Sequence, residues 1–397
     1  MLSLSMIVRN EAAQIEDCLR SVQGFVDEMV VVDTGSTDNT VALAEAMGAR
    51  VERIPWPGDF APARNQALEW VQGDWVLVLD ADERLRPEAM APLRALMAQP
   101  DLLLINLLRH ERGAVQSPYS NVSRLFRRHP AIRWSRAYHS MVDDSVAALL
   151  EQEPHWRLAD CPEPALIHDG YRPELLAMGS KAQRLREAME AELVERPGDP
   201  YACAKLGSLE VAEGNRERGR ALLRQGLEQC PTDAHPERYE LLLHLALAEA
   251  PDTPQQAAQL YRQALALPLA PRLNLAARLN LAALLLQQGD LEEAEQLCRR
   301  ATSCAPEIGL GWYNLGLIRR RQGDIAGALE AYREAKRLSP EHAETHQNLA
   351  VALLLGGDIE GARTSFRQAI ELLAAQGRQA DAAQLRQQAG AMVKLEA

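Results

Sequence analysis

The chain of 397 residues carries 43 Lys and Arg against 55 Asp and Glu, and this formal net charge of −12 argues against nucleic acid or an anionic membrane as a partner. An apolar fraction of 47% is ample for packed cores, and the length predicts two or three domains. Six cysteines without a CxxC pair indicate reduced thiols in a cytoplasmic protein. The N-terminus lacks a basic region and the chain lacks a long apolar run, so we expect no signal peptide and no transmembrane segment.

The first half of the sequence alternates short apolar runs with amphipathic segments. Strands are expected over residues 4–8, 29–32, 50–54, 75–79 and 102–108, and helices over residues 10–22, 40–48 and 63–71. Strands and helices that alternate at short spacing predict a parallel α/β sheet. The pattern weakens beyond residue 140, and a long helix over residues 175–195 is expected to join this half to the next.

An acidic triplet, Asp80-Ala81-Asp82, follows the apolar run over residues 75–79. The carboxyl end of a parallel strand is where an open α/β sheet places its ligands. Two carboxylates at positions i and i+2 of an extended chain point the same way, so both can reach one divalent cation or its diphosphate partner. Taken alone, the triplet fits equally well a polar turn that exposes acids to water.

The second half of the sequence repeats itself with a period of 34 residues. Gly-Asp pairs recur at 289–290, 323–324 and 357–358, and small residues and prolines keep the same step. A period of this length, with a Gly turn between two helices and Pro after the second, resembles the tetratricopeptide repeat. About five such units are expected over residues 199–375, and residues 376–397 are expected to form a polar helix that caps the open end.

Four motifs in the first half occur in the order and spacing typical of one enzyme family. They are Ser5-Met6-Ile7-Val8-Arg9-Asn10-Glu11, Val31-Val32-Asp33-Thr34-Gly35-Ser36-Thr37-Asp38-Asn39-Thr40, Ala63-Arg64-Asn65 and Leu79-Asp80-Ala81-Asp82-Glu83. Together they resemble the family 2 glycosyltransferases, which have the GT-A fold and use nucleotide sugars. The resemblance implies an α/β GT-A domain with a Rossmann-like mixed sheet over residues 1–175, a linking helix over residues 176–198 and an all-α tetratricopeptide-repeat solenoid beyond it.

The resemblance assigns roles in donor binding to four of these residues. In the family, the residue that matches Asp33 accepts hydrogen bonds from the base or ribose; alternatively, the stretch from Asp33 to Asp38 is a polar loop that caps the next helix. Arg64 is expected to contact the base or a phosphate, or else to be an exposed residue of a first helical turn. Asp80 is implied to hold the ribose, and Asp82 to bind Mg²⁺ or Mn²⁺, which stabilises a departing nucleoside diphosphate.

Later segments resemble a subgroup of these enzymes that carries tetratricopeptide repeats. Arg124-Leu125-Phe126-Arg127 and His168-Asp169-Gly170-Tyr171 belong to this resemblance. By its position, His168 is either a third metal or phosphate ligand or a core histidine bonded to backbone. Lys181 and Arg184 lie three residues apart on one expected helix face, where both can reach a diphosphate or simply face water.

An inverting transfer needs a base that deprotonates the acceptor as it attacks. The subgroup often shows His-Glu where this chain has His139-Ser140, so the family acid is in question. Asp143, Asp144 and His139 are the candidate bases, and the sequence does not choose among them.

The resulting hypothesis is a metal-dependent, inverting glycosyltransferase that uses a UDP-sugar, the family default, and whose repeats recruit a protein or peptide acceptor. The layout is similar to that of bacterial peptide S-glycosyltransferases. One alternative is transfer to a cell-envelope glycan, with the repeats used for docking or for formation of a homodimer. The other is a repeat scaffold with a degenerate transferase domain.

Overall fold

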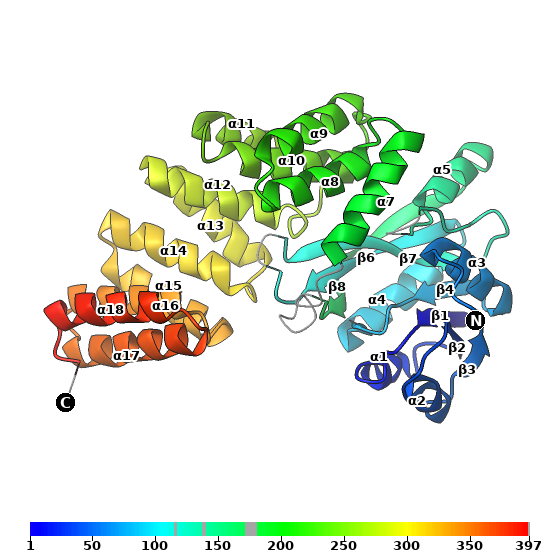
Figure 1. Cartoon of the computed structure of the whole chain (residues 1–397), viewed down its shortest axis with the longest axis horizontal. Helices are drawn as coiled ribbons and strands as arrows, with labels where there is room; N and C mark the ends of the chain where they lie inside the picture. The colour runs from blue at the N-terminus through cyan, green and yellow to red at the C-terminus, as the bar shows by residue number, and fades with distance from the viewer. Residues whose placement is uncertain (115–116, 137–139, 171–180, 396–397) are drawn as a thin grey trace. The chain divides into compact units, whose positions relative to one another are not determined.

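The computed structural model describes residues 1–114, 117–136, 140–170 and 181–395, which form two compact units, Met1–Cys230 and Pro231–Ala397 (Figure 1). The predicted fold class is confirmed, because the first unit holds a mixed α/β sheet and the elements described in the second unit are all helices. No helix within these ranges is long and apolar enough to span a membrane.

An eight-stranded sheet forms the centre of the first unit, with the strand order β3-β2-β1-β4-β7-β6-β8-β5 in the described residues. Its strands are β1 (Leu2–Val8), β2 (Glu28–Asp33), β3 (Arg50–Arg53), β4 (Trp75–Val78), β5 (Glu83–Leu85), β6 (Leu102–Glu111), β7 (Tyr119–Arg127) and β8 (Arg157–His168). The β3, β2, β1 and β4 strands run parallel, whereas β7 pairs antiparallel with both β4 and β6. The β8 strand runs parallel to β6 and antiparallel to β5.

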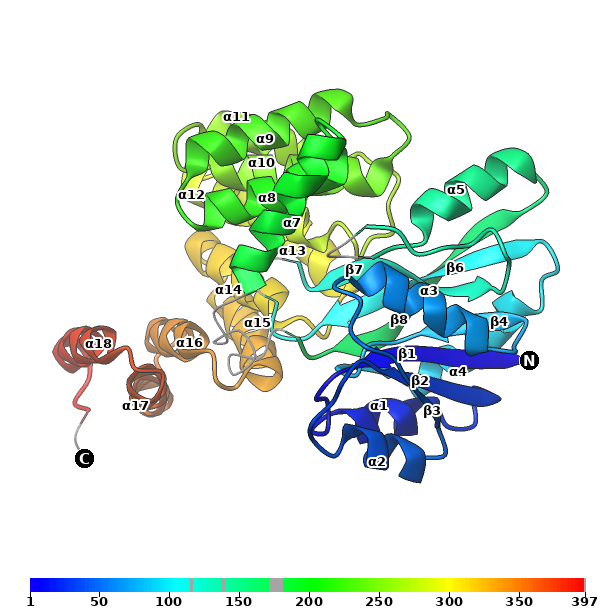
Figure 2. The same ribbon diagram turned by 45° about the vertical axis from the view of Figure 1, so that its right-hand side comes forward.

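Alternating residues of the central strands supply a separate core on each face of the sheet. In β4, Trp75 and Leu77 pack on one face while Val76 and Val78 pack on the other, which explains why this run is apolar throughout. The helices that cover the two faces can be followed in Figure 2: α1 (Ile15–Val22), α2 (Thr40–Ala46) and α4 (Pro87–Met97) on the first, α3 (Phe60–Trp70) and α5 (Asp143–Gln152) on the second.

The carboxyl ends of β1 and β4 form the topological switch point of the parallel half. The β2 and β3 strands extend the sheet on one side of β1, and the chain then returns to place β4 on the other side. Open α/β sheets bind ligands in the crevice at such a point. The segment 79–82 leads from β4 to β5 at the far edge of the sheet, so the acidic triplet lies at this crevice.

Two features of this unit differ from what the sequence predicts. Helix α1 begins at Ile15 rather than at residue 10, because Asn10 adopts a left-handed backbone with a φ of 57°. The β5, α4, β7, β8 and α5 elements are not predicted at all. Many residues of β7 and β8 are partly or fully exposed, so these strands lack a clear apolar signal.

Three helices that follow the sheet belong to the same compact unit: α7 (Lys181–Glu195), α8 (Pro200–Ala212) and α9 (Arg216–Gln229). Helices α8 and α9 approach closely, since a Cβ atom added to Gly219 would lie 2.8 Å from the carbonyl oxygen of Gly207. The unit ends at Cys230, beyond the residue 198 at which the linking helix is expected to end.

Paired helices build the second unit, and the same local signal sets three of the turns between them. The helices are α10 (His235–Glu249), α11 (Pro254–Leu265), α12 (Leu275–Gln288), α13 (Leu291–Cys304), α14 (Gly309–Gln322), α15 (Ile325–Leu338), α16 (Ala343–Leu355), α17 (Ile359–Ala375) and α18 (Gln379–Met392). Gly289, Gly323 and Gly357 each adopt a φ of 86°, which favours glycine. The Asp that follows each of them caps the next helix by accepting a backbone N–H. The 34-residue period thus reflects one turn used repeatedly.

Candidate active site

Asp33, the last residue of β2, organises the loop that follows it. Its side chain is buried, and its carboxylate accepts hydrogen bonds from the backbone N–H groups of Gly35 and Ser36, at 3.3 and 3.0 Å. Asn10, which follows β1, accepts a hydrogen bond from the Thr37 backbone at 2.8 Å and donates its own N–H to the Ser36 hydroxyl at 2.9 Å. The loops after β1 and β2 are therefore fastened together at the crevice.

Asp80 lies between two arginines. Arg64 from α3 contacts one carboxylate oxygen at 2.6 Å, and Arg124 from β7 contacts the other at 2.8 Å. Burial opposes the charge on Asp80, but Arg124 and Arg64 outweigh it and hold the pKa of this carboxyl far below its usual range. Asp80 is therefore ionised and bound on both oxygens by side chains of the protein itself.

A β-bulge places Arg124 in this position. Between the pairs Ile105–Leu125 and Leu107–Val122, one residue of β6 stands opposite two residues of β7, namely Ser123 and Arg124. Such an extra residue changes the direction in which side chains leave a strand, and bulges are frequent beside active sites.

The indole of Trp134 forms a floor under both arginines. The guanidinium carbons of Arg64 and Arg124 lie 4.7 and 5.8 Å from its ring centre, within the range of cation–π attraction. The Asn65 side chain fixes the backbone of Trp134 with two hydrogen bonds, of 2.9 and 2.8 Å. Nε and Nη1 of Arg64 and Nη1 of Arg124 are buried and have no hydrogen-bond partner among the described residues.

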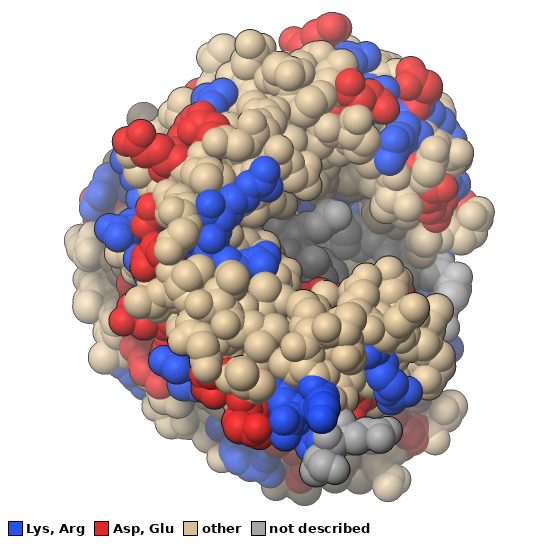
Figure 3. Space-filling view, turned by 90° about the vertical axis from the view of Figure 1, so that its left-hand side faces the viewer, with Lys and Arg blue, Asp and Glu red and all other residues tan. Residues whose placement is uncertain are grey.

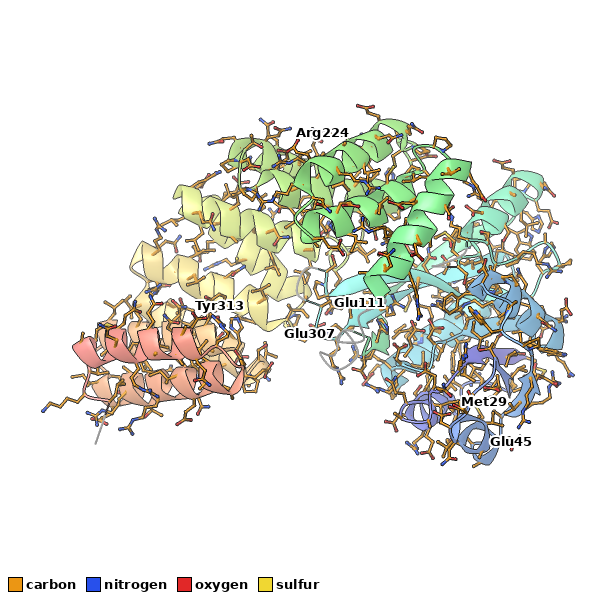
Figure 4. All side chains as sticks on the ribbon, viewed as in Figure 1. Met29, Glu45, Glu111, Arg224, Glu307 and Tyr313 are labelled. Carbon is orange, nitrogen blue, oxygen red and sulfur yellow. The ribbon has the colours of Figure 1, made fainter. Side chains whose placement is uncertain are left out.

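Asp82 has a different environment, in which it faces His168 at the end of β8. Its carboxylate lies 3.1 Å from Nε2 of His168, and Nδ1 of the same ring lies 2.5 Å from Glu111. Glu111 lies at the end of β6 and is labelled in Figure 4. Burial lowers the pKa of His168, but the hydrogen bonds with Asp82 and Glu111 outweigh it and raise this pKa to about 9. Burial likewise opposes the charge on Glu111, while His168 and Arg109 lower its pKa to about 2.

Buried charged side chains hold the acidic triplet and its neighbours in position. Glu83 is fully buried, and its carboxylate accepts the backbone N–H of Asp80 at 2.9 Å. Arg109 bridges Glu83 and Glu111 through contacts of 2.5 and 2.8 Å. Glu83 therefore holds the turn of the acidic triplet in place.

Glu11 adds a further carboxylate to the crevice. It is partly buried, and burial together with the charges of Asp82 and Asp80 raises its pKa to about 7. A bound cation would relieve this repulsion. Glu11 and Arg124 lie within motifs that the sequence displays, but only the fold shows that their side chains face the triplet.

Comparison with known proteins matches these features to two families. The family described as Glycosyl transferase family 2 matches residues 3–158, and tetratricopeptide repeats match residues 253–307 and 307–375. A TPR repeat-containing protein of Synechococcus elongatus is 44% identical over 309 residues, which is 77% of this chain and 76% of that protein. The chain belongs to the family 2 glycosyltransferases that carry tetratricopeptide repeats.

Two further relatives of this glycosyltransferase match mainly its first half. An uncharacterized glycosyltransferase of Rickettsia bellii is 34% identical over 154 residues, which is 36% of this chain and 52% of that protein. The SPbeta prophage-derived glycosyltransferase SunS of Bacillus subtilis is 25% identical over 210 residues, which is 50% of this chain and 46% of that protein. The chain thus spans about half the length of each of these two relatives.

The residues predicted to bind a metal fit part of a coordination shell. Among the described residues, no group of three His, Cys, Asp or Glu side chains is arranged to hold a metal ion. Asp82 and His168 nevertheless form a carboxylate–imidazole pair of the kind that suits Mn²⁺ better than Mg²⁺, and His168, with its pKa of about 9, would release a proton on binding the ion. Glu111 binds Nδ1 of His168 and so directs Nε2 toward Asp82, which is the usual outer support of a metal-binding histidine. Diphosphate oxygens and water are the remaining ligands that such ions take.

The other predicted site residues of the glycosyltransferase lie in separate surroundings. Asp143 is exposed in the first turn of α5 and accepts a hydrogen bond from Ser123 at 2.7 Å. Asp144, the next residue, is bound by Arg136 at 3.2 Å. Arg184 is exposed on α7. His139 and the side chain of Lys181 lie outside the described residues.

Proposed function

We propose that this enzyme transfers a sugar, with inversion and with Mn²⁺ or Mg²⁺ as cofactor, from a UDP-sugar to a protein or peptide acceptor that the repeats recruit. The donor half of the proposal rests on one observation: Glu11, Asp80 and Asp82 meet two buried arginines at the switch point between β1 and β4. Acidic side chains suit a divalent cation, and guanidinium groups suit the phosphates of a nucleotide.

The proposal assigns a role to each group of residues in the crevice. The unpartnered N–H groups of Arg64 and Arg124 bind phosphate or base, and Asp33 accepts hydrogen bonds from the base or ribose. Asp82 and His168 hold the cation, which when bound supplies positive charge to the departing diphosphate. Asp80 keeps both arginines in place.

Asp143 is the proposed base. The protein packed around it raises the pKa of its carboxyl, although part of the group stays open to solvent, whereas Arg136 and Ser135 lower the pKa of Asp144 against the opposing effect of burial. A base is more effective when its pKa approaches the working pH. We expect Asp143→Asn to reduce kcat about 100-fold without changing the affinity for UDP, and Glu151→Gln, at an exposed acid of the same helix, to leave kcat within about threefold. An unchanged kcat in Asp143→Asn would exclude this assignment.

A donor panel tests the reaction itself. Hydrolysis of UDP-, GDP- and dTDP-sugars is measured with Mn²⁺ and with Mg²⁺, and calorimetry measures the binding of UDP. We expect one UDP-sugar to be hydrolysed with Mn²⁺ and not after chelation. If no donor is hydrolysed and UDP does not bind, the proposal is wrong and the scaffold alternative is supported.

The second unit supports the proposal of a protein acceptor. Leu286, Leu317 and Leu355, from helices α12, α14 and α16, line a pocket of about 370 Å³ together with Arg320 and Arg321. Leu355 is 60% exposed, which is unusual for a large apolar side chain. Aliphatic walls beside guanidinium groups suit a peptide that pairs an aliphatic residue with an acidic one.

A charge reversal with a matched control tests this pocket. Arg321→Glu is expected to weaken the binding of fluorescent peptides that pair Leu with Asp or Glu about fivefold, a change of roughly 1 kcal/mol. Arg333→Glu makes the same change on an exposed residue of α15 and should leave binding unaltered. Equal effects of the two variants would count against the pocket. Transfer to a sugar acceptor that survives removal of residues 231–397 would instead favour the cell-envelope glycan.

The surface charge and the cysteines support a cytoplasmic enzyme that does not bind nucleic acid. On the face drawn in Figure 3, basic and acidic side chains are interspersed, which does not suit a nucleic-acid backbone. We place the enzyme in the cytoplasm because its six cysteines are free thiols.

A further inference from the structure

Arg136 occupies an unusual position in the first unit. It is one of two residues other than glycine with positive φ in the described chain, at 69°, and its side chain is only 9% exposed. Its guanidinium contacts Asp144 at 3.2 Å, Asp199 at 3.0 Å and Glu192 at 3.4 Å. A left-handed conformation costs energy for any residue with a side chain, so these contacts must offset that cost.

The partners of Arg136 join separate parts of the unit. Asp144 belongs to α5, which packs on the sheet, whereas Glu192 lies on α7 and Asp199 caps α8. The ring of Tyr201, in the first turn of α8, lies 5.2 Å from the guanidinium carbon of Arg136. One arginine therefore connects the transferase sheet to both helices.

The backbone next to Arg136 continues to Trp134, whose ring lies beside the donor-binding arginines. Ser135 and Met141 exchange two backbone hydrogen bonds, of 2.9 and 3.0 Å, and so close the loop that contains Arg136. Trp134, two residues before Arg136, carries the ring on which Arg64 and Arg124 stack. Arg136 is thus two residues of backbone away from the ring that lies beside both guanidinium groups.

We propose that Arg136 is a positioning residue that holds Trp134 under the donor-binding arginines by tying its loop to α7 and α8. The inference rests on the proposed donor site and extends it, because it makes these helices part of the transferase rather than a linker. A lysine cannot replace the arginine, since only a planar fork of five N–H donors serves three carboxylates and stacks on a tyrosine. Removing it leaves Asp144, Glu192 and Asp199 facing one another, with the exposed Arg196 as the other described cation within 4 Å of them.

The experiment compares Arg136→Gln with Arg196→Gln in the full chain. Arg196 is 51% exposed and lies 3.7 Å from both Asp144 and Glu192, so its substitution removes a charge from the same cluster without touching the Trp134 loop. The protein is labelled with 5-fluorotryptophan, and the ¹⁹F resonance of Trp134 is assigned by its absence in Trp134→Phe. UDP affinity is measured in excess Mn²⁺.

We expect Arg136→Gln to shift or broaden the Trp134 resonance and to weaken UDP binding about tenfold, while Arg196→Gln changes affinity less than about twofold. If Arg136→Gln does not fold, Asp199→Asn carries the test, because asparagine keeps the cap acceptor for Ala202 but loses the ion pair. Folded variants with an unshifted Trp134 resonance and wild-type affinity would overturn the proposal. A wild-type protein that does not bind UDP would contradict the proposed donor, and the Trp134 resonance would still test the role of Arg136.

Discussion

Asp80 and Asp82 are two residues apart, yet the protein surrounds them in opposite ways. Asp80 is bound by two arginines above an indole, and its pKa is held low. Asp82 instead faces His168 and adds to the negative charge that raises the pKa of Glu11 to about 7. One carboxylate is held by two arginines, and the other is held by a single histidine that it shares with Glu111.

This difference gives the two acids of the triplet separate roles. The charge of Asp80 stabilises the fold, because it supplies the counter-charge for two buried arginines, some of whose N–H groups have no hydrogen-bond partner among the described residues. The charge at Asp82 is paired with His168 in the free protein, and a cation that binds there would take the place of the proton on this imidazole. A pair of acids that looks equivalent in sequence thus combines a residue held by two arginines with one that we propose to bind the metal.

Substitution of Asp82 is expected to give the largest functional effect. Asp82→Asn should reduce transfer about 1,000-fold even in excess Mn²⁺, because the charge that stabilises the leaving group would be lost, and it should change the melting temperature little. Steady-state kinetics with a Mn²⁺ titration measures the first quantity and thermal unfolding the second. Asp101→Asn, which removes an exposed acid paired with Arg157, is the control. Full activity of Asp82→Asn in excess Mn²⁺ would show that the two carboxylates do not differ as described.

Substitution of Asp80, unlike that of Asp82, is expected to lower the stability of the protein strongly. Asp80→Asn leaves Arg64 and Arg124 without a counter-charge, and we expect a loss of about 3 kcal/mol in the free energy of unfolding, the lower end of the range for a broken buried pair because the Asp80 side chain is 36% exposed. Chemical denaturation measures this loss.

The pH dependence of the free energy of unfolding gives a second test of whether the charge of Asp80 stabilises the fold. The pKa of Asp80 is lower in the folded than in the unfolded protein, so its stabilisation is present above about pH 4 and is lost as the pH falls toward the folded pKa. The difference in unfolding free energy between wild type and Asp80→Asn should therefore shrink below pH 4. A difference that stays constant with pH would mean that the charge of Asp80 does not stabilise the fold.

The two units differ in how far the sequence alone predicts them. In the second unit, a left-handed Gly and a capping Asp set the turns at residues 289–290, 323–324 and 357–358, so the repeats could be recognised from local signals. The site depends on distant pairings instead. Arg124 reaches Asp80 through a bulge in β7, and Glu111 reaches His168 because β6 and β8 are neighbours. No local pattern reveals such a register, which is why the motifs indicate Asp80 and Asp82 but not their opposite surroundings.

The smallest expected effect tests whether the two carboxylates are independent. Asn65→Ala removes both hydrogen bonds that fix the backbone of Trp134, and leaving these groups unpaired should cost about 2 kcal/mol of stability and weaken UDP binding. Asn121→Ala, which loses one exposed hydrogen bond to Asp160, is the control. Affinity for Mn²⁺ alone, measured by calorimetry, should stay unchanged, because Asn65 acts on the Asp80 side of the crevice. If Asn65→Ala weakens Mn²⁺ binding as much as UDP binding, the triplet acts as one unit, and the division between its two acids is wrong.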